Sequence, residues 1–401
     1  MGLRTKLDRW AMLGVAMSTQ VAGTALLNAA PFLIPYLHLV EGLSLVEAGF
    51  VAAAPQVGTM LTLIAWGVVV DRVGERVALL TGMALMSLAA FAAAFSTSPA
   101  LLGVFLLLAG AAGAANNSAS GRLVIGWFPP ERRGFAMGIR QTAQPLGTGV
   151  AALTVPALVA AAGLREALLV PATLCAVSFA LTTLLLVDPP RPTRAQARDL
   201  GQLDNPYRRD GRLWRVHLAS MLLVIPQFTV WTFALVWLID EKGWSSIAAG
   251  ALVAVLQVLG AAARIGAGVW SDRAGSRLRP MRVIAALAAL TMLALGLLDG
   301  TPLAIALMTI ASVVSVADNG LAFTSVAEIA GPYWSGRAMG TQNTGQFLFA
   351  AAVPPAVGAL ITGSGYGAAF AIVAVAPLLA IPLVPVRHEH GTSRTPRVPS
   401  G

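Results

Sequence analysis

WGVVVDRVGER, residues 66–76, closes a run of about twenty uncharged residues and then places two acids and two arginines within six positions. A run of that length is long enough to cross the hydrocarbon core of a bilayer, about 30 Å thick, as a helix. A second copy, GVWSDRAGSR, occupies residues 268–277. The matched positions share an offset of 201 residues and are Gly67 and Gly268, Asp71 and Asp272, Gly74 and Gly275, and Arg76 and Arg277. The sequence therefore predicts a membrane protein whose second half repeats its first.

Composition supports the membrane assignment. The 401 residues are 57% hydrophobic and 11% charged, and the mean hydropathy is +0.75, whereas soluble domains are about 25% charged. Apolar runs long enough to span a bilayer occupy residues 10–37, 44–70, 77–97, 100–128, 134–162, 164–187, 213–239, 245–270, 280–299, 302–330, 337–362 and 366–386. We predict an all-α integral membrane fold with twelve transmembrane helices.

The placement of the basic residues excludes nucleic-acid binding, which a net charge of +9 and a pI near 10.9 would otherwise suggest. Most of the 27 Lys and Arg lie in the termini, the central linker and every second loop. Only Arg165 and Lys242 lie on the opposite side, and Arg122, Arg140 and Arg264 lie within spans. By the positive-inside rule this asymmetry predicts a multi-pass cell-membrane protein with both termini in the cytoplasm.

The repeat continues beyond the first loop, now at an offset of 202 residues. The further matches are Asn117 with Asn319, GFAMG at 134–138 with GRAMG at 336–340, and Gln144 with Gln346. We therefore divide the chain into a six-helix half at 1–187, a Pro- and Arg-rich cytoplasmic linker at 188–212, a second six-helix half at 213–386 and a cytoplasmic tail at 387–401. The two halves are expected to be pseudo-symmetric.

The pattern G-x-x-x-D-R-x-G-x-R, present twice, resembles the signature loop of the major facilitator superfamily of secondary transporters. The span number, linker and half-repeat extend the resemblance over essentially the whole chain. It implies two halves that rock about a central cavity. Two departures disfavour drug/proton antiport: Ala109 stands where many proton-coupled members carry an arginine, and Arg140 and Gln144 stand where the antiporter motif has glycines.

In that family the signature loops are thought to latch the halves together on the cytoplasmic side. Asp71 would lie at a helix C-terminus, which is unfavourable for an acid, so we expect it to need Arg72, Arg76 or a neighbouring helix as partner. The residues to which the resemblance gives a gating role are Asp71, Arg72, Gly74, Arg76, Asp272, Arg273, Gly275, Arg277 and Glu328. The alternative is that they are turn formers and positive-inside anchors.

Arg264 is the most informative intramembrane charge. It lies eight residues before Asp272, about 12 Å inside the membrane edge, where an arginine normally faces a cavity or a partner. Gln257 and Gly260 share its helical face, whereas the equivalent position in the first half is Leu63. This asymmetry favours a substrate-binding role for Arg264.

A second polar band is expected across the fifth and eleventh spans, because Arg140 and Gln144 match Gln342 and Gln346. Arg140 either faces the cavity or extends to the cytoplasmic interface; the latter, or pairing in the latch, is favoured for Arg122. The predicted substrate-binding residues are Arg264, Arg140, Gln257, Gln144, Gln342, Gln346, Asn117 and Asn319.

Asp318 is the one acid placed near mid-membrane, and Asn116 is its mate in the first half. A buried carboxylate can couple transport to protons, because its affinity for a proton changes with its surroundings. It can equally serve as a permanent counter-ion to Arg264 or Arg140. Both alternatives stay open.

We predict alternating-access transport of a small organic or inorganic anion such as a monocarboxylate, with proton coupling left open. Segments around Arg140 and Arg264 resemble cyanate, nitrate and small organic anion porters. The alternatives are a drug or metabolite efflux pump and, more remotely, a non-transporting membrane receptor. No nucleotide-binding or hydrolase motif occurs, so no enzyme activity, cofactor or metal is expected, and the protein is expected to be a monomer.

Overall fold

The computed structural model describes residues 3–209 and 211–386, which fold as helices and loops without strands. Eleven segments within these residues are long and apolar enough to span a membrane. The longest, Ser335–Leu383, is broken at Gly365, whose φ of 80° and ψ of 168° are not helical. It therefore supplies two crossings, and the predicted twelve-helix fold is confirmed. The tail at 387–401 lies outside the described residues.

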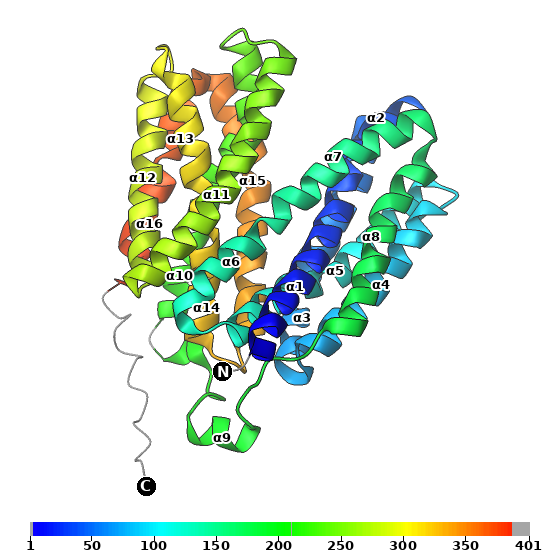
Figure 1. Ribbon diagram of the computed structural model, residues 1–401. Coiled ribbons are helices and arrows are strands. Elements are labelled where there is room, and N and C mark those ends of the chain that lie inside the picture. Colours follow the sequence, from blue (N-terminus) through cyan, green and yellow to red (C-terminus); the bar gives the residue numbers. More distant parts are fainter. Residues whose placement is uncertain (1–2, 210, 387–401) are drawn as a thin grey trace.

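The first half forms one bundle, drawn from blue to green in Figure 1. Its helices are α1 (Leu3–Ala29), continued by α2 (Ile34–Leu39), α3 (Leu45–Val73), α4 (Glu75–Ala94), α5 (Pro99–Trp127), α6 (Arg133–Gln141), α7 (Ala143–Ala161) and α8 (Leu164–Leu185). Ser44 begins α3 with a capping box to Glu47, and Ser98 caps α5. Gly74, with φ of 102°, makes the tight turn between α3 and α4.

The second half forms another bundle after the short linker helix α9 (Arg194–Asp199). Its helices are α10 (Arg212–Asp240), α11 (Ser246–Ala274), α12 (Leu278–Leu297), α13 (Leu303–Ala317), α14 (Asn319–Ala330), α15 (Ser335–Val373) and α16 (Val375–Leu383). The fifth and tenth crossings are each interrupted within the span. The fifth breaks at Thr142, three residues before Pro145, whose ring crowds the preceding turn, and the tenth breaks at Asp318.

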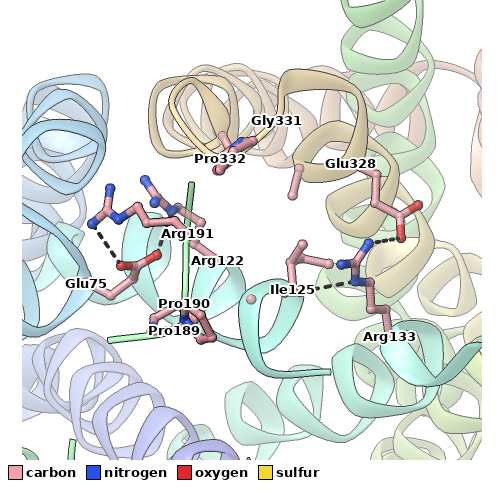
Figure 2. A pocket seen from close by; sticks show the side chains of 13 residues that line it. Glu75, Arg122, Ile125, Arg133, Pro189, Pro190, Arg191, Glu328, Gly331 and Pro332 are labelled. Atoms are coloured by element: carbon pink, nitrogen blue, oxygen red, sulfur yellow. Dashed lines mark hydrogen bonds and ion pairs between the residues drawn. The ribbon is translucent and has the colours of Figure 1, made fainter. Parts of the chain in front are cut away.

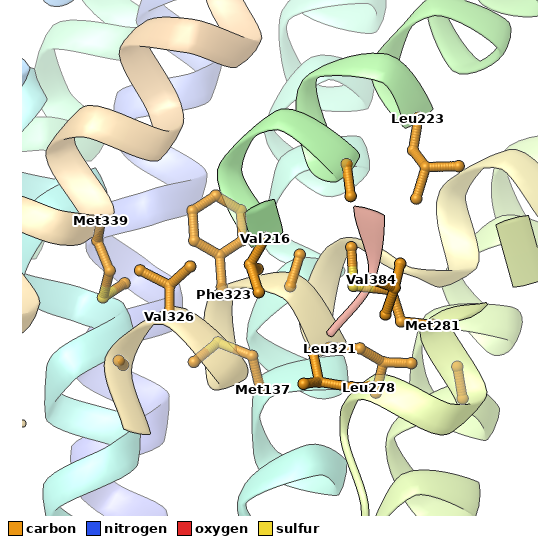
Figure 3. Packing of buried hydrophobic residues seen from close by; sticks show 14 of the residues in the cluster. Met137, Val216, Leu223, Leu278, Met281, Leu321, Phe323, Val326, Met339 and Val384 are labelled. Carbon is orange, nitrogen blue, oxygen red and sulfur yellow. The ribbon is translucent and has the colours of Figure 1, made fainter. Parts of the chain in front are cut away.

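The two bundles meet at the end where α9 lies, here called the linker end, and diverge toward the opposite, far end (Figure 1). The hydrophobic packing follows this shape. At the linker end one cluster combines Met137 of α6 with Phe323 and Val326 of α14 and Met339 of α15 (Figure 3). Toward the far end each bundle has a cluster of its own. Within residues 3–209 and 211–386, the hydrophobic cluster shared by the two bundles therefore lies at the linker end.

Glycines let the helix backbones of the two bundles touch. A Cβ built on Gly336 would lie 2.5 Å from the carbonyl oxygen of Gly67, and one on Gly134 would lie 2.5 Å from that of Gly268. Neither distance is tolerable, so α15 packs on α3, and α6 on α11, only because these positions lack side chains. The conserved spacing of the two sequence repeats thus becomes a pair of matched helix crossings.

Gly268→Val should push the bundles apart at the linker end, because the new side chain overlaps the backbone of Gly134. Overpacking costs about 1–3 kcal/mol, so the population with an open linker end should rise about 5- to 150-fold. The reporter is maleimide labelling of Ser335→Cys, a buried position at the start of α15, with Cys175, the single native cysteine, replaced by alanine. Gly266→Val is the control, since nothing lies within 4 Å of its Cβ position. Equal labelling of the two valine variants would contradict the expectation.

Candidate functional site

The carboxylate of Asp71, at the end of α3, caps the N-terminus of α15 in the other bundle. Its oxygens accept hydrogen bonds from the backbone N–H groups of Gly336 and Arg337 at 2.8 and 3.0 Å. The side chains of Arg337 and Arg122 add ion pairs at 2.8 and 3.0 Å. The first N–H groups of a helix lack partners and carry partial positive charge, which makes a carboxylate favourable there. The neighbouring-helix partner expected for Asp71 is therefore α15.

Asp272 makes the matching contact at the end of α11. It accepts hydrogen bonds from the backbone N–H groups of Gly134 and Phe135, at 2.9 and 2.8 Å, where α6 begins. Arg277 pairs with Asp272 and donates to the carbonyl of Pro130 in the first bundle. Two pseudo-symmetric carboxylate caps thus join the bundles, and we call them the linker-end latch.

Glu328 of α14 also joins the two bundles, and Figure 2 shows its ion pair with Arg133. Its carboxylate lies 3.3 Å from Nη1 of Arg133, in the first bundle, and 3.5 Å from Nε of Arg277, in the second. The expected pairing of Glu328 with the second signature loop is therefore present. Arg133, which the sequence reasoning did not single out, completes it.

The five other residues with a predicted gating role make no contact between the bundles. Arg72 and Arg273 are exposed and have no ion pair or hydrogen bond to any described residue. Arg76 donates its backbone N–H to Asp188 at 2.7 Å and so binds the start of the linker. The positive φ angles of Gly74 and Gly275, 102° and 58°, place both glycines in turns. For these five residues the geometry matches the anchor-and-turn alternative.

Arg122 takes part in this linker-end network instead of extending to the interface. Besides Asp71 it pairs with Glu75 at 2.6 Å, and Glu75 also pairs with Arg191 of the linker at 3.4 Å. Arg122, Glu75 and Arg191 line a cavity of about 240 Å³ between the bundles and the linker (Figure 2). Glu75 and Arg191 were missed from the sequence, although Glu75 lies within the opening stretch.

Arg264 lies in the second bundle with an unsatisfied guanidinium group. Only 1% of its surface is exposed, and neither Nε nor Nη2 has a hydrogen-bond partner. It lines a cavity of about 30 Å³, here the arginine cavity, together with Gln257 and Gly260, as their shared helical face predicted. Trp231 and Ser312 complete its polar and aromatic wall. A buried cation without partners is costly, so this cavity favours an anion.

Arg140 is equally buried, with 3% of its surface exposed, but its donors are satisfied. Its nitrogens donate to Ser120 at 2.7 and 3.1 Å, to Gln141 at 2.7 Å and to Gln20 at 3.1 Å. All of these partners belong to the first bundle. Arg140 therefore neither extends to the interface nor presents a free cation to a ligand in this conformation.

Two amide pairs follow the repeat. Gln20 donates to Asn117 at 3.1 Å in the first bundle, and Asn319 donates to Gln227 at 3.1 Å in the second. The two pairs occupy equivalent helix crossings. They differ in surroundings, since Asn117 belongs to the network around Arg140 whereas Asn319 lines a cavity.

That second cavity, of about 60 Å³, is framed by six side-chain amides, and we call it the amide cavity. Its amides are Gln141, Gln144, Gln227, Asn319, Asn343 and Gln346. Gln141 and Gln144 come from the first bundle, and the other four from the second. Trp231 lines both this cavity and the arginine cavity, so the two are neighbours. Gln141 and Asn343 are a repeat-matched pair that the sequence reasoning overlooked.

Gln342 lies behind the amide cavity, fully buried, and does not line it. Its Oε1 lies 2.6 Å from Nδ1 of His217, and its Nε2 donates to Ser220 at 3.1 Å. His217 Nε2 lies 3.0 Å from the Tyr207 hydroxyl, and Gln346 donates to Ser220 at 2.7 Å. Burial raises the pKa of Tyr207, so its hydroxyl stays protonated and can donate to His217. This series of hydrogen bonds runs from Tyr207 in the linker to Gln346 and holds the Gln346 side chain in place. No motif in the sequence indicated a role for His217.

Asp318 is buried, with 2% of its surface exposed, between α13 and α14. It forms no ion pair within 4 Å with any described residue, which includes Arg264 and Arg140. Its charge nevertheless interacts with that of Arg264 at longer range, so the proton-coupling and counter-ion alternatives both stay open. Its mate Asn116 donates to the carbonyl of Thr19 at 3.0 Å.

A twelve-crossing helical fold in two bundles, with polar cavities at mid-membrane, is the architecture of a secondary transporter. Residues 12–354 match the Major Facilitator Superfamily. The chain is 49% identical over 381 residues to the uncharacterized MFS-type transporter Rv2994 of Mycobacterium tuberculosis, covering 94% of this chain and 85% of that one. The chain belongs to the Major Facilitator Superfamily.

Two further comparisons extend this result. The chain is 26% identical over 387 residues to the probable sulfoacetate transporter SauU of Cupriavidus necator, covering 88% of this chain and 89% of that one. It superposes on a crystal structure of the transporter FucP in the outward conformation with a TM-score of 0.71. That superposition covers 93% of this chain and 97% of FucP at 17% identity, so it concerns the fold alone.

Arg264→Leu and Arg140→Leu should change thermal stability in opposite directions. The first removes a buried cation without hydrogen-bond partners and should raise the melting temperature. The second leaves the side-chain oxygens of Gln20 and Gln141 without the donor they have in Arg140 and should lower it. Each effect should be about 1–3 kcal/mol. Thermal unfolding of the purified variants in one detergent measures both. A stabilising Arg140→Leu together with a destabilising Arg264→Leu would contradict the assignment of the free cation.

Proposed function

We propose that this protein is a secondary transporter of a small anion, which Arg264 binds. The observation that carries the proposal is the Arg264 guanidinium, buried in the second bundle with two nitrogens lacking hydrogen-bond partners. A carboxylate or sulfonate would offer oxygen acceptors to this planar donor group and offset its charge. The likeness to the probable sulfoacetate transporter SauU supports an anionic substrate.

The size and lining of the arginine and amide cavities disfavour the efflux-pump alternative in this conformation. A larger apolar pocket of about 510 Å³ lies on α3, α4 and α5 and shares no residue with either cavity. Cavities of about 30 and 60 Å³, lined by an arginine and amides, suit a small polar solute. Drug-sized ligands occupy cavities of about 300–1,000 Å³ that are mostly apolar. A small anion therefore remains the better proposal.

The proposed transport cycle uses the linker-end latch as its inner gate. By the positive-inside rule the Arg-rich linker end lies in the cytoplasm, so the conformation described above faces outward. Opening the inner side requires Asp71 and Asp272 to leave the N-termini of α15 and α6. Substrate binding shifts the protein toward the inward-open state only if the substrate binds that state more tightly than the outward-open state.

Flux of labelled monocarboxylates into proteoliposomes tests the anion site. Arg264→Gln should lower uptake at subsaturating substrate by about 10- to 150-fold, the equivalent of one lost charge-assisted hydrogen bond. Arg165→Gln is the matched control, because Arg165 is an exposed arginine near the start of α8, at the far end. Uptake by Arg264→Gln at the wild-type rate, or saturable uptake of no anion at all, would refute the proposal.

Proton coupling is proposed for Asp318, because a buried carboxylate without an ion pair can bind and release a proton between states. Asp318→Asn should abolish accumulation driven by a pH gradient and leave equilibrium exchange of substrate intact. The two assays run on the same proteoliposomes, with the exchange rate as the control for folding. Accumulation that still follows the pH gradient in Asp318→Asn would exclude this residue as the coupling site.

A further inference from the structure

We infer that the transported anion carries a second, uncharged hydrogen-bonding group about one to two helical turns from its charged end, and that both bundles contact this group when they close. The inference rests on the proposed anion site. It arises from the position of the amide cavity beside the arginine cavity, and from the bundle that contributes each wall.

The two cavities are stacked along the same pair of crossings. On α10 the arginine cavity is lined by Val230 and Ala234 and the amide cavity by Val224 and Gln227, with Trp231 shared. On the tenth crossing the corresponding residues are Ser312 and Val316, then Asn319 and Phe323. A helical turn rises about 5.4 Å. The residues that line the two cavities are offset by about four positions on α10 and seven on the tenth crossing, which at 1.5 Å per residue is about 6–10 Å along the helices. One small elongated molecule can reach both cavities.

The arginine cavity belongs to the second bundle alone. Every residue that lines it lies between Val230 and Val316. Because an α-helical side chain points back toward the N-terminus of its helix, Arg264 extends from α11 toward Gln257. An anionic group bound here meets no residue of the first bundle. Such a group holds a ligand in place, but its contacts lie within one bundle and do not change when the bundles move.

The amide cavity, by contrast, is built by both bundles. Gln144 of α7 faces it from the first bundle, and Gln346 of α15 from the second. No charged residue lines it. A second carboxylate or an ammonium group would be desolvated there without a counter-charge, which is costly. The group that fits is therefore neutral.

The amides offer both free donors and free acceptors, since Gln141 and Gln227 use only their side-chain oxygens. The side chain of Gln144 makes no hydrogen bond to any described residue. Gln346 and Asn343 use their Nδ2 or Nε2 groups on Ser220 and on the carbonyl of Met339, which leaves both side-chain oxygens free as acceptors. A hydroxyl or a carboxamide supplies the matching N–H or O–H. The substrate class is thus a hydroxy or amide derivative of a small monoanion.

This arrangement separates binding from movement. A plain monoanion can occupy the arginine cavity and compete with substrate. A bifunctional anion can also connect Gln144 of the first bundle to Gln346 of the second. Only this contact changes when the bundles rotate against each other. Since a ligand shifts a conformational equilibrium only through differential affinity, the second group should raise the transport rate more than it lowers the apparent KM.

A set of acids with the same carbon skeleton tests the inference in proteoliposomes: butyrate, 4-hydroxybutyrate, succinamate and succinate. In the wild type, 4-hydroxybutyrate and succinamate should be transported with a kcat about 10-fold above that of butyrate, which is the effect of one net hydrogen bond. Butyrate should still inhibit their uptake competitively. Succinate, with its second charge, should neither be transported nor inhibit at the same concentrations.

Gln144→Leu should abolish the 10-fold advantage and leave inhibition by butyrate unchanged, because the arginine cavity is intact. Gln56→Leu is the matched control, since Gln56 is an intramembrane glutamine of α3 that lines neither cavity. Arg264→Gln should lose inhibition by all of the acids. Tryptophan fluorescence titration of purified protein with butyrate provides a binding readout that does not depend on transport.

The outcomes distinguish the inference from the proposal on which it rests. If butyrate is transported as fast as 4-hydroxybutyrate in the wild type, the second-group inference is overturned and the anion site survives. Retention of the full 10-fold advantage by Gln144→Leu also overturns it. If Arg264→Gln binds butyrate as the wild type does, the anion site itself is wrong and the inference fails with it.

Discussion

The capping of a helix N-terminus by a carboxylate from the opposite bundle is the contact on which this conformation depends. Asp71 and Asp272 each lie at the unfavourable end of their own helix and are stabilised by the favourable end of another. The contact is thus available only when the bundles are together. Because both carboxylates can be hydrated once the bundles part, the latch has a finite free energy, as a gate requires. The glycines at the same crossings set how closely it can form.

Apolar packing reinforces this gate asymmetrically along the membrane normal. One hydrophobic cluster crosses between the bundles at the linker end, through Met137, Phe323 and Met339, whereas the far end has separate clusters. Burial of apolar surface therefore favours the same closed end as the carboxylate caps. A substrate that opens this end has to offset both the carboxylate caps and the apolar packing. The transport rate therefore depends on binding free energy that is gained only in the transition state of the conformational change.

Sequence periodicity and repeats were sufficient to predict the fold, because each crossing is a long apolar run and the two halves share a fixed offset. They also placed Arg264, Gln257 and Gly260 on one face, since that depends on helical geometry alone. The partners of Arg140 and the position of Gln342 behind the cavity were not predictable. Those depend on how separate helices rotate against one another, which a single sequence does not record. His217 was missed for the same reason, because its partners come from the linker and α15.

The repeat separates two kinds of residue. Positions that match between the halves, such as Asp71 with Asp272 and Gly134 with Gly336, form contacts that recur in both and close the linker end. Positions that differ, such as Arg264 against Leu63 and Asp318 against Asn116, carry the charges buried at mid-membrane. A symmetric gate needs equal residues on its two sides, whereas a solute with one charged end needs a site with one cation. In the proposed function, substrate specificity therefore lies where the symmetry of the repeat is broken.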